Sequence, residues 1–194
     1  PDDASLVDML NMALILCMAD APSPATYVAR MVASTGGTPY AVVMASMAAL
    51  VGVRQGGTLA RVEALFEQVG TPEKAHATLA GRLQRGENVP AFRHDAYPDG
   101  DPRARLLLEV LAQQDLPNPD ALALAQSIQT SAYDLMAGQP NLQFALVTLV
   151  RAYDLPAGSA QALFALGRSV AWIGHAIEQY QSDTAIHLPL RYEG

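Results

Sequence analysis

Apolar residues recur at spacings of three and four along almost the whole chain, and this period constrains the fold more than any other feature. Such spacing places the apolar side chains on one face of an α-helix. The pattern covers residues 6–19, 27–33, 41–50, 59–69, 75–83, 104–111, 122–135, 144–153 and 160–177. The alternation typical of a strand extends beyond four residues only in 185–192. The sequence therefore predicts an all-α protein.

Short breaks between these segments contain residues that begin helices. Residues 71–73 (Thr-Pro-Glu) and 118–120 (Asn-Pro-Asp) each combine a capping side chain, a first-turn proline and an acid. The acid suits the positive end of the helix dipole. Residues 140–141 (Pro-Asn) are a weaker version, so we expect helices to begin at all three places.

The longest stretch without a helical pattern is 86–102, which contains Pro90, Pro98, Gly100 and Pro102. Loops of this length in compact domains often carry function. We therefore expect candidate binding or catalytic residues in this loop.

Composition excludes several classes of function. A formal net charge of −7 does not fit a general role in binding nucleic acid or an anionic membrane. Cys17 is the single cysteine, which excludes a disulfide within the chain and a multi-cysteine metal site. A reducing cytoplasm is the compartment that we expect. No apolar run reaches the length of a membrane-spanning helix.

Two segments, 40–51 and 164–177, are apolar nearly all round. A helix of this kind is buried on more than one side. We therefore expect either an oligomer or another part of the polypeptide to cover them. The chain opens at Pro1 in what reads as the approach to a helix, so we also expect sequence upstream.

Three motifs carry a family resemblance: VPAFRHDAYPDGDPRA at 89–104, PNLQF at 140–144 and FALGRSVAWIGHAIEQ at 164–179. Their order and spacing resemble the C-terminal half of citrate synthases, and the match runs almost without gaps from residue 13 to residue 194. The YPDGD sequence at 97–101 resembles a divergent bacterial branch of that family.

The resemblance implies a citrate synthase-like multi-helical fold and a homodimer. Residues 1–55 and 153–194 would belong to the large domain, and residues 56–152 to the small, mobile domain that faces coenzyme A. The family condenses acetyl-CoA, or another acyl-CoA, with oxaloacetate or a related 2-oxo acid. The resemblance implies no metal and no permanently bound cofactor, so a coenzyme A thioester would be a substrate.

By this resemblance, three positions correspond to the family's catalytic groups, and one of the three residues is retained. The histidine that polarises the ketone is retained as His94. The histidine that stabilises the enol is replaced by Gln55, and the aspartate that removes the methyl proton is replaced by Gln143.

The binding positions are partly retained. Arg103 and Arg168 match the arginines that hold the substrate carboxylates, whereas the substrate-binding histidine falls on Asp20. The arginine that reaches the neighbouring subunit's site falls on Leu188, and nearby Arg191 could compensate. The segment whose backbone would hold the adenine of coenzyme A consists of Val89, Pro90, Ala91, Phe92 and Arg93.

These departures change the expected chemistry. The Gln143 amide is not basic near neutral pH, and a positioned general base contributes roughly 10²- to 10⁴-fold to a rate. Gln55 can still donate a hydrogen bond, whereas Asp20 repels a dicarboxylate unless an arginine screens it. The residues therefore predict impaired or lost condensation at a site that still binds a ligand.

Each retained residue also has a purely structural interpretation. His94 could be a solvated loop residue, and Arg103 could pair with a nearby acid. The acids close to it in sequence are Asp99, Asp101 and Glu109. Arg168 needs an anionic partner, which could be a ligand carboxylate or Asp20.

Three functions remain open at this point. The protein could be an active condensing enzyme with an altered substrate, with Asp95 or Asp20 as the base. It could be a non-catalytic binder of a carboxylate or acyl-CoA, or a regulatory subunit of an intact citrate synthase paralogue. It could also be a structural remnant that dimerises through its apolar helices.

Overall fold

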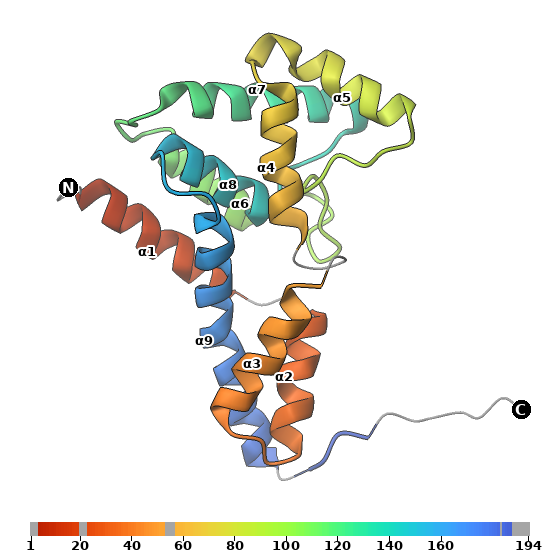
Figure 1. The fold of residues 1–194 in the computed structure, drawn as a ribbon, viewed down its shortest axis with the longest axis vertical. Helices are drawn as coiled ribbons and strands as arrows, with labels where there is room; N and C mark the ends of the chain where they lie inside the picture. Colours follow the sequence, from red (N-terminus) through yellow and green to blue (C-terminus); the bar gives the residue numbers. More distant parts are fainter. Residues whose placement is uncertain (1–3, 20–22, 53–56, 183, 188–194) are drawn as a thin grey trace, which may run out of the picture.

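The computed structural model describes residues 4–19, 23–52, 57–182 and 184–187. Within these residues the chain forms nine α-helices and one 3₁₀ turn, without a strand, so the all-α prediction is confirmed (Figure 1). The elements are α1 (Ala4–Met18), α2 (Pro24–Ser34), α3 (Pro39–Leu50), α4 (Gly57–Val69), η1 (Pro72–Lys74), α5 (Ala75–Gln84), α6 (Pro102–Leu111), α7 (Pro119–Met136), α8 (Leu142–Ala152) and α9 (Ser159–Ser182). The described part of the tail, 184–187, is irregular, and 188–192 lies outside the described residues.

The predicted helix starts are correct at two of the three breaks. The Asn118 side chain accepts a hydrogen bond from the Ala121 N–H at 3.2 Å at the start of α7, and Asn141 caps α8. At the third break the Thr71 side chain makes no capping bond. The first-turn proline there begins η1 instead, and α5 follows directly at Ala75.

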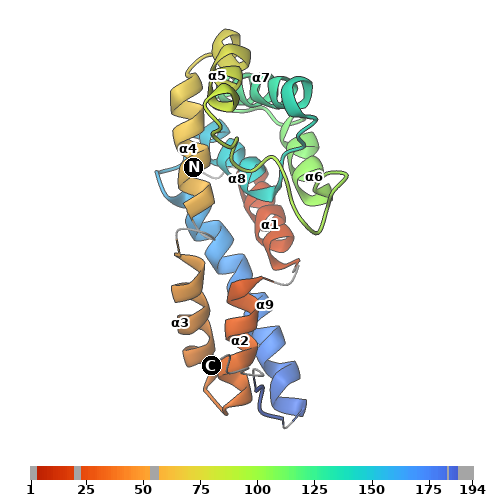
Figure 2. The same cartoon turned by 90° about the vertical axis from the view of Figure 1, so that its right-hand side faces the viewer.

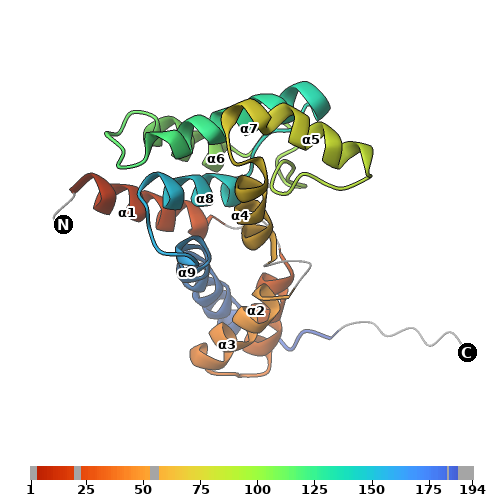
Figure 3. The same ribbon diagram turned by 45° about the horizontal axis from the view of Figure 1, so that its top comes forward.

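The helices form an upper and a lower group (Figure 2), and each group has an apolar core of its own. The first joins α1, α4 to α8 and the start of α9, and the second joins α2, α3 and the rest of α9. Figure 3 shows α5 and α7 side by side above α4 and α8. The long helix α9 runs from one core into the other, so it sets the position of any site between them.

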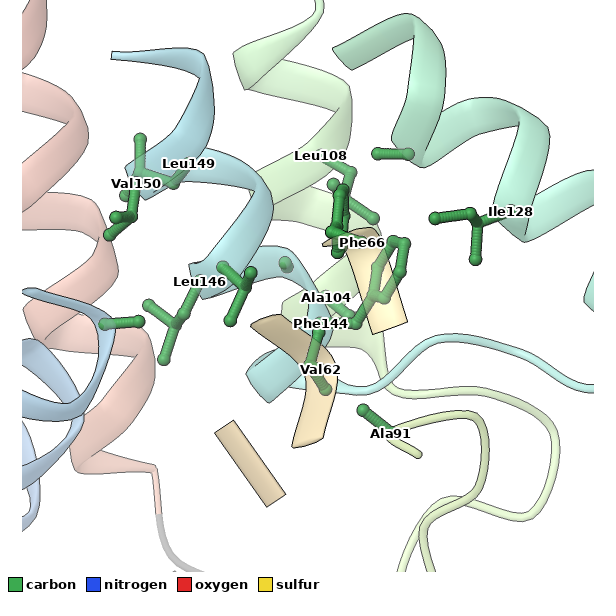
Figure 4. Close-up of a cluster of buried hydrophobic side chains, with 14 of the residues drawn as sticks. Val62, Phe66, Ala91, Ala104, Leu108, Ile128, Phe144, Leu146, Leu149 and Val150 are labelled. Atoms are coloured by element: carbon green, nitrogen blue, oxygen red, sulfur yellow. The ribbon is translucent and has the colours of Figure 1, made fainter. Parts of the chain in front are cut away.

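Helix α8 is the centre of the first core, because its side chains are buried almost all round. Phe144 on α8 contacts Phe66, with ring centroids 5.3 Å apart (Figure 4). It also contacts Phe92, with ring centroids 4.9 Å apart. Phe92 belongs to the long loop, so this aromatic cluster holds the loop against the amino end of α8.

Helices α1 and α9 cross at Gly167. A Cβ atom at this position would lie 2.8 Å from the Leu14 carbonyl oxygen and still closer to the Cys17 side chain. Only glycine therefore permits this crossing, which brings the carboxyl end of α1 beside α9.

The segments 40–51 and 164–177, which we expected to be covered on several sides, belong to α3 and α9. In the single chain, both helices leave apolar side chains exposed. Tyr40 and Met44 on α3 are 83% and 73% exposed. The exposed apolar residues of α9 are Leu166, Val170, Ile173, Ile177 and Tyr180. The described helices include none that is long and apolar enough to cross a membrane.

Candidate active site

A cavity of about 170 Å³ lies between the two cores. The loop, α6 and α8 contribute His94, Arg103, Asn141, Leu142 and Gln143, and the α2, α3 and α9 side contributes Ser23, Ala25, Leu50, Phe164 and Arg168. The structure therefore brings together four of the predicted site residues, which are His94, Arg103, Gln143 and Arg168.

His94 is held in the loop by its own backbone neighbourhood. The Ala96 N–H donates to Nδ1 at 3.2 Å, and the ring lies against Tyr97 with centroids 4.9 Å apart. Burial lowers the pKa of His94, and the Arg103 charge lowers it further, while Asp101 and Asp95 oppose the shift. At neutral pH the imidazole is therefore uncharged and carries a single N–H.

Neutral His94 and Arg103 each direct an N–H donor toward the other. Because Nδ1 accepts from Ala96, we assign the proton to Nε2, which lies 3.3 Å from Nη2 of Arg103. Two N–H groups cannot satisfy one another, but both can donate to a shared oxygen atom. This corner of the cavity is therefore suited to a carbonyl or carboxylate oxygen.

Arg103 is fixed from several sides. Its Nε and Nη2 donate to the two Asp101 carboxylate oxygens, each at 2.9 Å, so Asp101 is the acid with which it pairs. Its Nη1 donates to the Ala19 carbonyl at 2.9 Å, and its guanidinium lies 5.0 Å from the centroid of the Tyr97 ring. The guanidinium is therefore held in place before any ligand arrives.

Opposing effects act on the pKa values of this pair. Burial alone would raise the pKa of Asp101, but the Arg103 hydrogen bonds and charge, with backbone N–H groups, hold it below its usual range. Burial also favours the neutral form of Arg103, but Asp101 outweighs it and raises the pKa of Arg103. Both groups are therefore charged at neutral pH.

Arg168 approaches the cavity from α9 and is only 6% exposed. Its Nη2 donates to Thr26 Oγ1 at 3.0 Å, and its Nη1 donates to the Ala19 carbonyl at 3.4 Å. The carbonyl that follows α1 thus lies between the two guanidinium groups of Arg103 and Arg168. The suggested partner Asp20 lies outside the described residues.

The amino end of α8 is tied to the loop by Asn141. The Asn141 backbone N–H donates to the Ala91 carbonyl at 2.8 Å, and its side-chain amide donates to the Arg93 carbonyl at 3.2 Å. Its side-chain oxygen accepts from the Gln143 N–H at 3.0 Å. These bonds place Gln143 on the cavity wall in the first turn of α8.

The segment expected to hold adenine precedes His94. Val89, Ala91 and Phe92 are buried, Pro90 is half-buried and Arg93 is exposed. Ala91 has φ of 64°, a left-handed conformation that favours glycine. Its carbonyl accepts the hydrogen bond from the Asn141 N–H at the start of α8.

A second pocket, of about 380 Å³, opens beside this segment and shares His94 with the first. Arg93, Asp95 and Tyr97 are among the residues that line it.

The remaining predicted site residues, Asp20, Gln55 and Arg191, lie outside the described residues, as does Leu188. Sequence reasoning missed the Ala19 carbonyl, which leaves no signal in a sequence. It also treated Asp101 only as one of three acids near Arg103. The order Asp101-Pro102 has the same capping pattern as Asn118-Pro119, and that pattern was the available signal.

The described residues form a two-core helical fold with a cationic cavity at the junction, and comparison with known proteins defines its family. The model of the citrate synthase C-terminal domain matches residues 1–190. The chain is 26% identical over 192 residues to citrate synthase 2 of Bacillus subtilis and 29% identical over 193 residues to the citrate synthase of Mycolicibacterium smegmatis. Each alignment covers 97% of this chain and 51% of the relative.

Solved structures agree with the sequence matches. The citrate synthase of Thermotoga maritima superposes with a TM-score of 0.85 at 27% identity, covering 97% of this chain and 53% of that one. A citrate synthase of Thermoplasma acidophilum, solved with carboxymethyl coenzyme A and oxaloacetate, has a TM-score of 0.83 at 24% identity, covering 98% and 53%. The chain belongs to the citrate synthase family and spans about half the length of the curated relatives that it matches.

Proposed function

We propose that the cavity between the two cores binds a small carboxylate ligand, such as a 2-oxo acid, and that condensation with an acyl-CoA is impaired or lost. The observation that carries this proposal is the convergence of His94 Nε2 and Arg103 Nη2, 3.3 Å apart, on a cavity whose wall bears Gln143. The N–H donors of His94 and Arg103 favour an anionic ligand. Gln143 supplies no general base, because its side chain is an amide.

The charge and hydrogen-bonding groups of the cavity support a carboxylate ligand. Arg103 and Arg168 are planar donors that suit carboxylate oxygens, and neutral His94 suits a ketone or carboxylate oxygen. The similar Thermoplasma protein was solved with oxaloacetate and a coenzyme A analogue. We propose the same two ligand classes here, with the acyl-CoA approaching through the pocket beside Val89–Arg93.

Gln143 supports the loss of turnover. An amide cannot take a proton from a thioester methyl group, and a missing general base costs roughly 10²- to 10⁴-fold. Asp95 does not replace it on the cavity wall, because this exposed acid lines the neighbouring pocket instead. A site with these groups favours binding over condensation.

Two assemblies fit this function. The exposed faces of α3 and α9 support a homodimer, and they equally suit an intact citrate synthase paralogue for which this protein would be a regulatory subunit. Because the chain spans about half of its relatives, a complete site also draws on the rest of such a polypeptide or on its partner.

The test is release of coenzyme A thiol from acetyl-CoA and propionyl-CoA in the presence of a panel of 2-oxo acids that includes oxaloacetate. We expect calorimetry to show that the full-length gene product binds a 2-oxo acid. We expect the thiol assay to show little release of coenzyme A. Gln143→Asp together with Gln55→His should increase thiol release. Turnover in the unaltered protein that disappears in His94→Ala would overturn the loss of condensation and point to a substitute base.

A further inference from the structure

Asp101 makes more contacts than its place in the helix requires. Its side chain is fully buried, and it stands immediately before α6 as the N-cap. Oδ1 accepts from the Arg103 backbone N–H at 3.1 Å and from Arg103 Nε at 2.9 Å. Oδ2 accepts from Arg103 Nη2 at 2.9 Å and from the Leu142 backbone N–H at 3.0 Å. A helix cap needs only the first of these four bonds.

The other three bonds run toward the cavity. Two of them set the plane of the Arg103 guanidinium, which leaves Nη1 on the Ala19 carbonyl and Nη2 beside His94. The third reaches the first residue of α8, immediately before Gln143. One carboxylate thereby joins the loop, α6 and α8, which are the three elements that supply one side of the cavity.

The stability of the fold does not by itself explain the buried ion pair between Asp101 and Arg103. A buried ion pair is often no more stabilising than apolar side chains of similar volume, because both charges lose their hydration. Asp101 does not line this cavity, whereas Arg103 does, so a carboxylate ligand bound there faces Arg103 and not Asp101. Asp101 lines the neighbouring pocket instead. Its contacts therefore affect carboxylate binding only through the groups that it orients.

We propose that Asp101 is the positioning residue of the carboxylate cavity: it fixes Arg103 beside His94 and fixes the amino end of α8, without touching the carboxylate ligand. The inference rests on the proposed function, that is, on a carboxylate ligand in this cavity. Asparagine cannot replace Asp101, because each carboxylate oxygen accepts from two N–H donors. Whichever oxygen becomes an amide NH₂ then faces donors.

The experiment compares Asp101→Asn with Asp99→Asn in the full-length protein. Asp99 lies in the same loop, is exposed and loses the same charge when it is replaced. Oxaloacetate is the probe, titrated by calorimetry. We expect Asp101→Asn to weaken oxaloacetate binding about 10-fold or more, since charge-assisted hydrogen bonds are lost at Arg103. Asp99→Asn should stay within about 2-fold, because rim charges contribute little.

A second readout needs no ligand. In protein labelled with ¹⁵N-arginine, the Arg103 Nε–H signal, identified by its loss in Arg103→Lys, should be protected from exchange. Asp101→Asn should abolish this protection and Asp99→Asn should keep it. If Asp101→Asn fails to fold, Asp101→Glu carries the comparison; it retains the charge on a longer arm and should bind oxaloacetate more weakly than the unaltered protein.

The outcomes separate the inference from the proposed function. Weaker binding and lost Arg103 protection in the Asp101 variant alone support the inference. Unchanged oxaloacetate affinity in a folded Asp101 variant overturns it and leaves the proposed function standing. An unaltered protein that binds no oxaloacetate or other 2-oxo acid contradicts the proposed function, and the inference then fails with it.

Discussion

The chemistry of this chain depends on a few polar residues whose roles are set by their neighbours. His94 is uncharged because it is buried beside Arg103, and Arg103 is fixed because Asp101 is ionised. Gln143 occupies the cavity wall with an amide that neither accepts nor releases a proton at neutral pH. At the scale of the residue, the cavity therefore presents hydrogen-bond donors, which suit the anionic ligand that we propose.

The ionised Asp101 makes the stability of the protein depend on pH. Its pKa in the folded protein is below the ordinary value of 3.8, so its stabilising contribution is present above that pH and is lost as the pH falls toward the folded pKa. We expect Asp101→Asn to lower Tm at pH 7, and the difference from the unaltered protein to shrink below about pH 4.

Melting curves between pH 7 and pH 3 measure this difference, and Asp99→Asn is the matched control because Asp99 is an exposed acid in the same loop. A difference in Tm that stays constant across the range would mean that the Asp101 charge does not contribute.

At the scale of the element, the crossing of α1 and α9 decides where the two guanidinium groups meet. Gly167 allows α9 to approach the Leu14 and Cys17 region, and the carbonyl that follows α1 then reaches both Arg103 and Arg168. A wider crossing would separate Arg168 from Ala19. The geometry of the cavity thus depends on a helix contact at Gly167, the residue before Arg168.

Two glycines on α9 test this crossing with the same substitution. Gly167→Ala should destabilise the protein by about 1–3 kcal/mol, because the added methyl group overlaps α1. Gly174→Ala should stabilise it by about 0.5–1 kcal/mol, because no atom lies within 4 Å of the added Cβ and alanine favours a helix. Denaturant unfolding of both variants measures the two changes, and equal effects would contradict the close crossing.

At the scale of the whole molecule, the single chain leaves apolar faces exposed on α3 and α9. Tyr40 and Met44 on α3 are among its most exposed large apolar side chains. Exposed apolar surface of this kind on several neighbouring helices is typical of an interface. The homodimer therefore stays a prediction that rests on these faces and on the family resemblance.

Sedimentation of the full-length protein tests the dimer. We expect Tyr40→Glu combined with Met44→Glu to shift it toward a monomer, because two buried charges would disrupt an apolar interface. Tyr133→Glu is the control, since Tyr133 is also an exposed aromatic residue but belongs to α7 in the other core. Dissociation by both changes, or by neither, would place the interface elsewhere.

The sequence by itself determined the helices, the loop and the family. All nine predicted helical segments are helices. Apolar residues spaced three and four positions apart lie on one face only when the segment is helical, and that face can then be buried. The local polar pattern also predicted the Asn118 and Asn141 caps, whose bonds span two or three residues. The motifs that contain His94, Arg103, Gln143 and Arg168 were sufficient to identify the family.

Only the tertiary structure decided how these residues act together. Arg103 and Ala19 are 84 positions apart, and Leu142 lies 41 positions from Asp101, so no local pattern predicts either hydrogen bond. The donor pair of His94 and Arg103, the choice of Asp101 over Asp99 and Glu109, and the place of Asp95 outside the cavity all follow from packing. Periodicity reports which face of a helix is buried, whereas the convergence of side chains depends on where several helices cross.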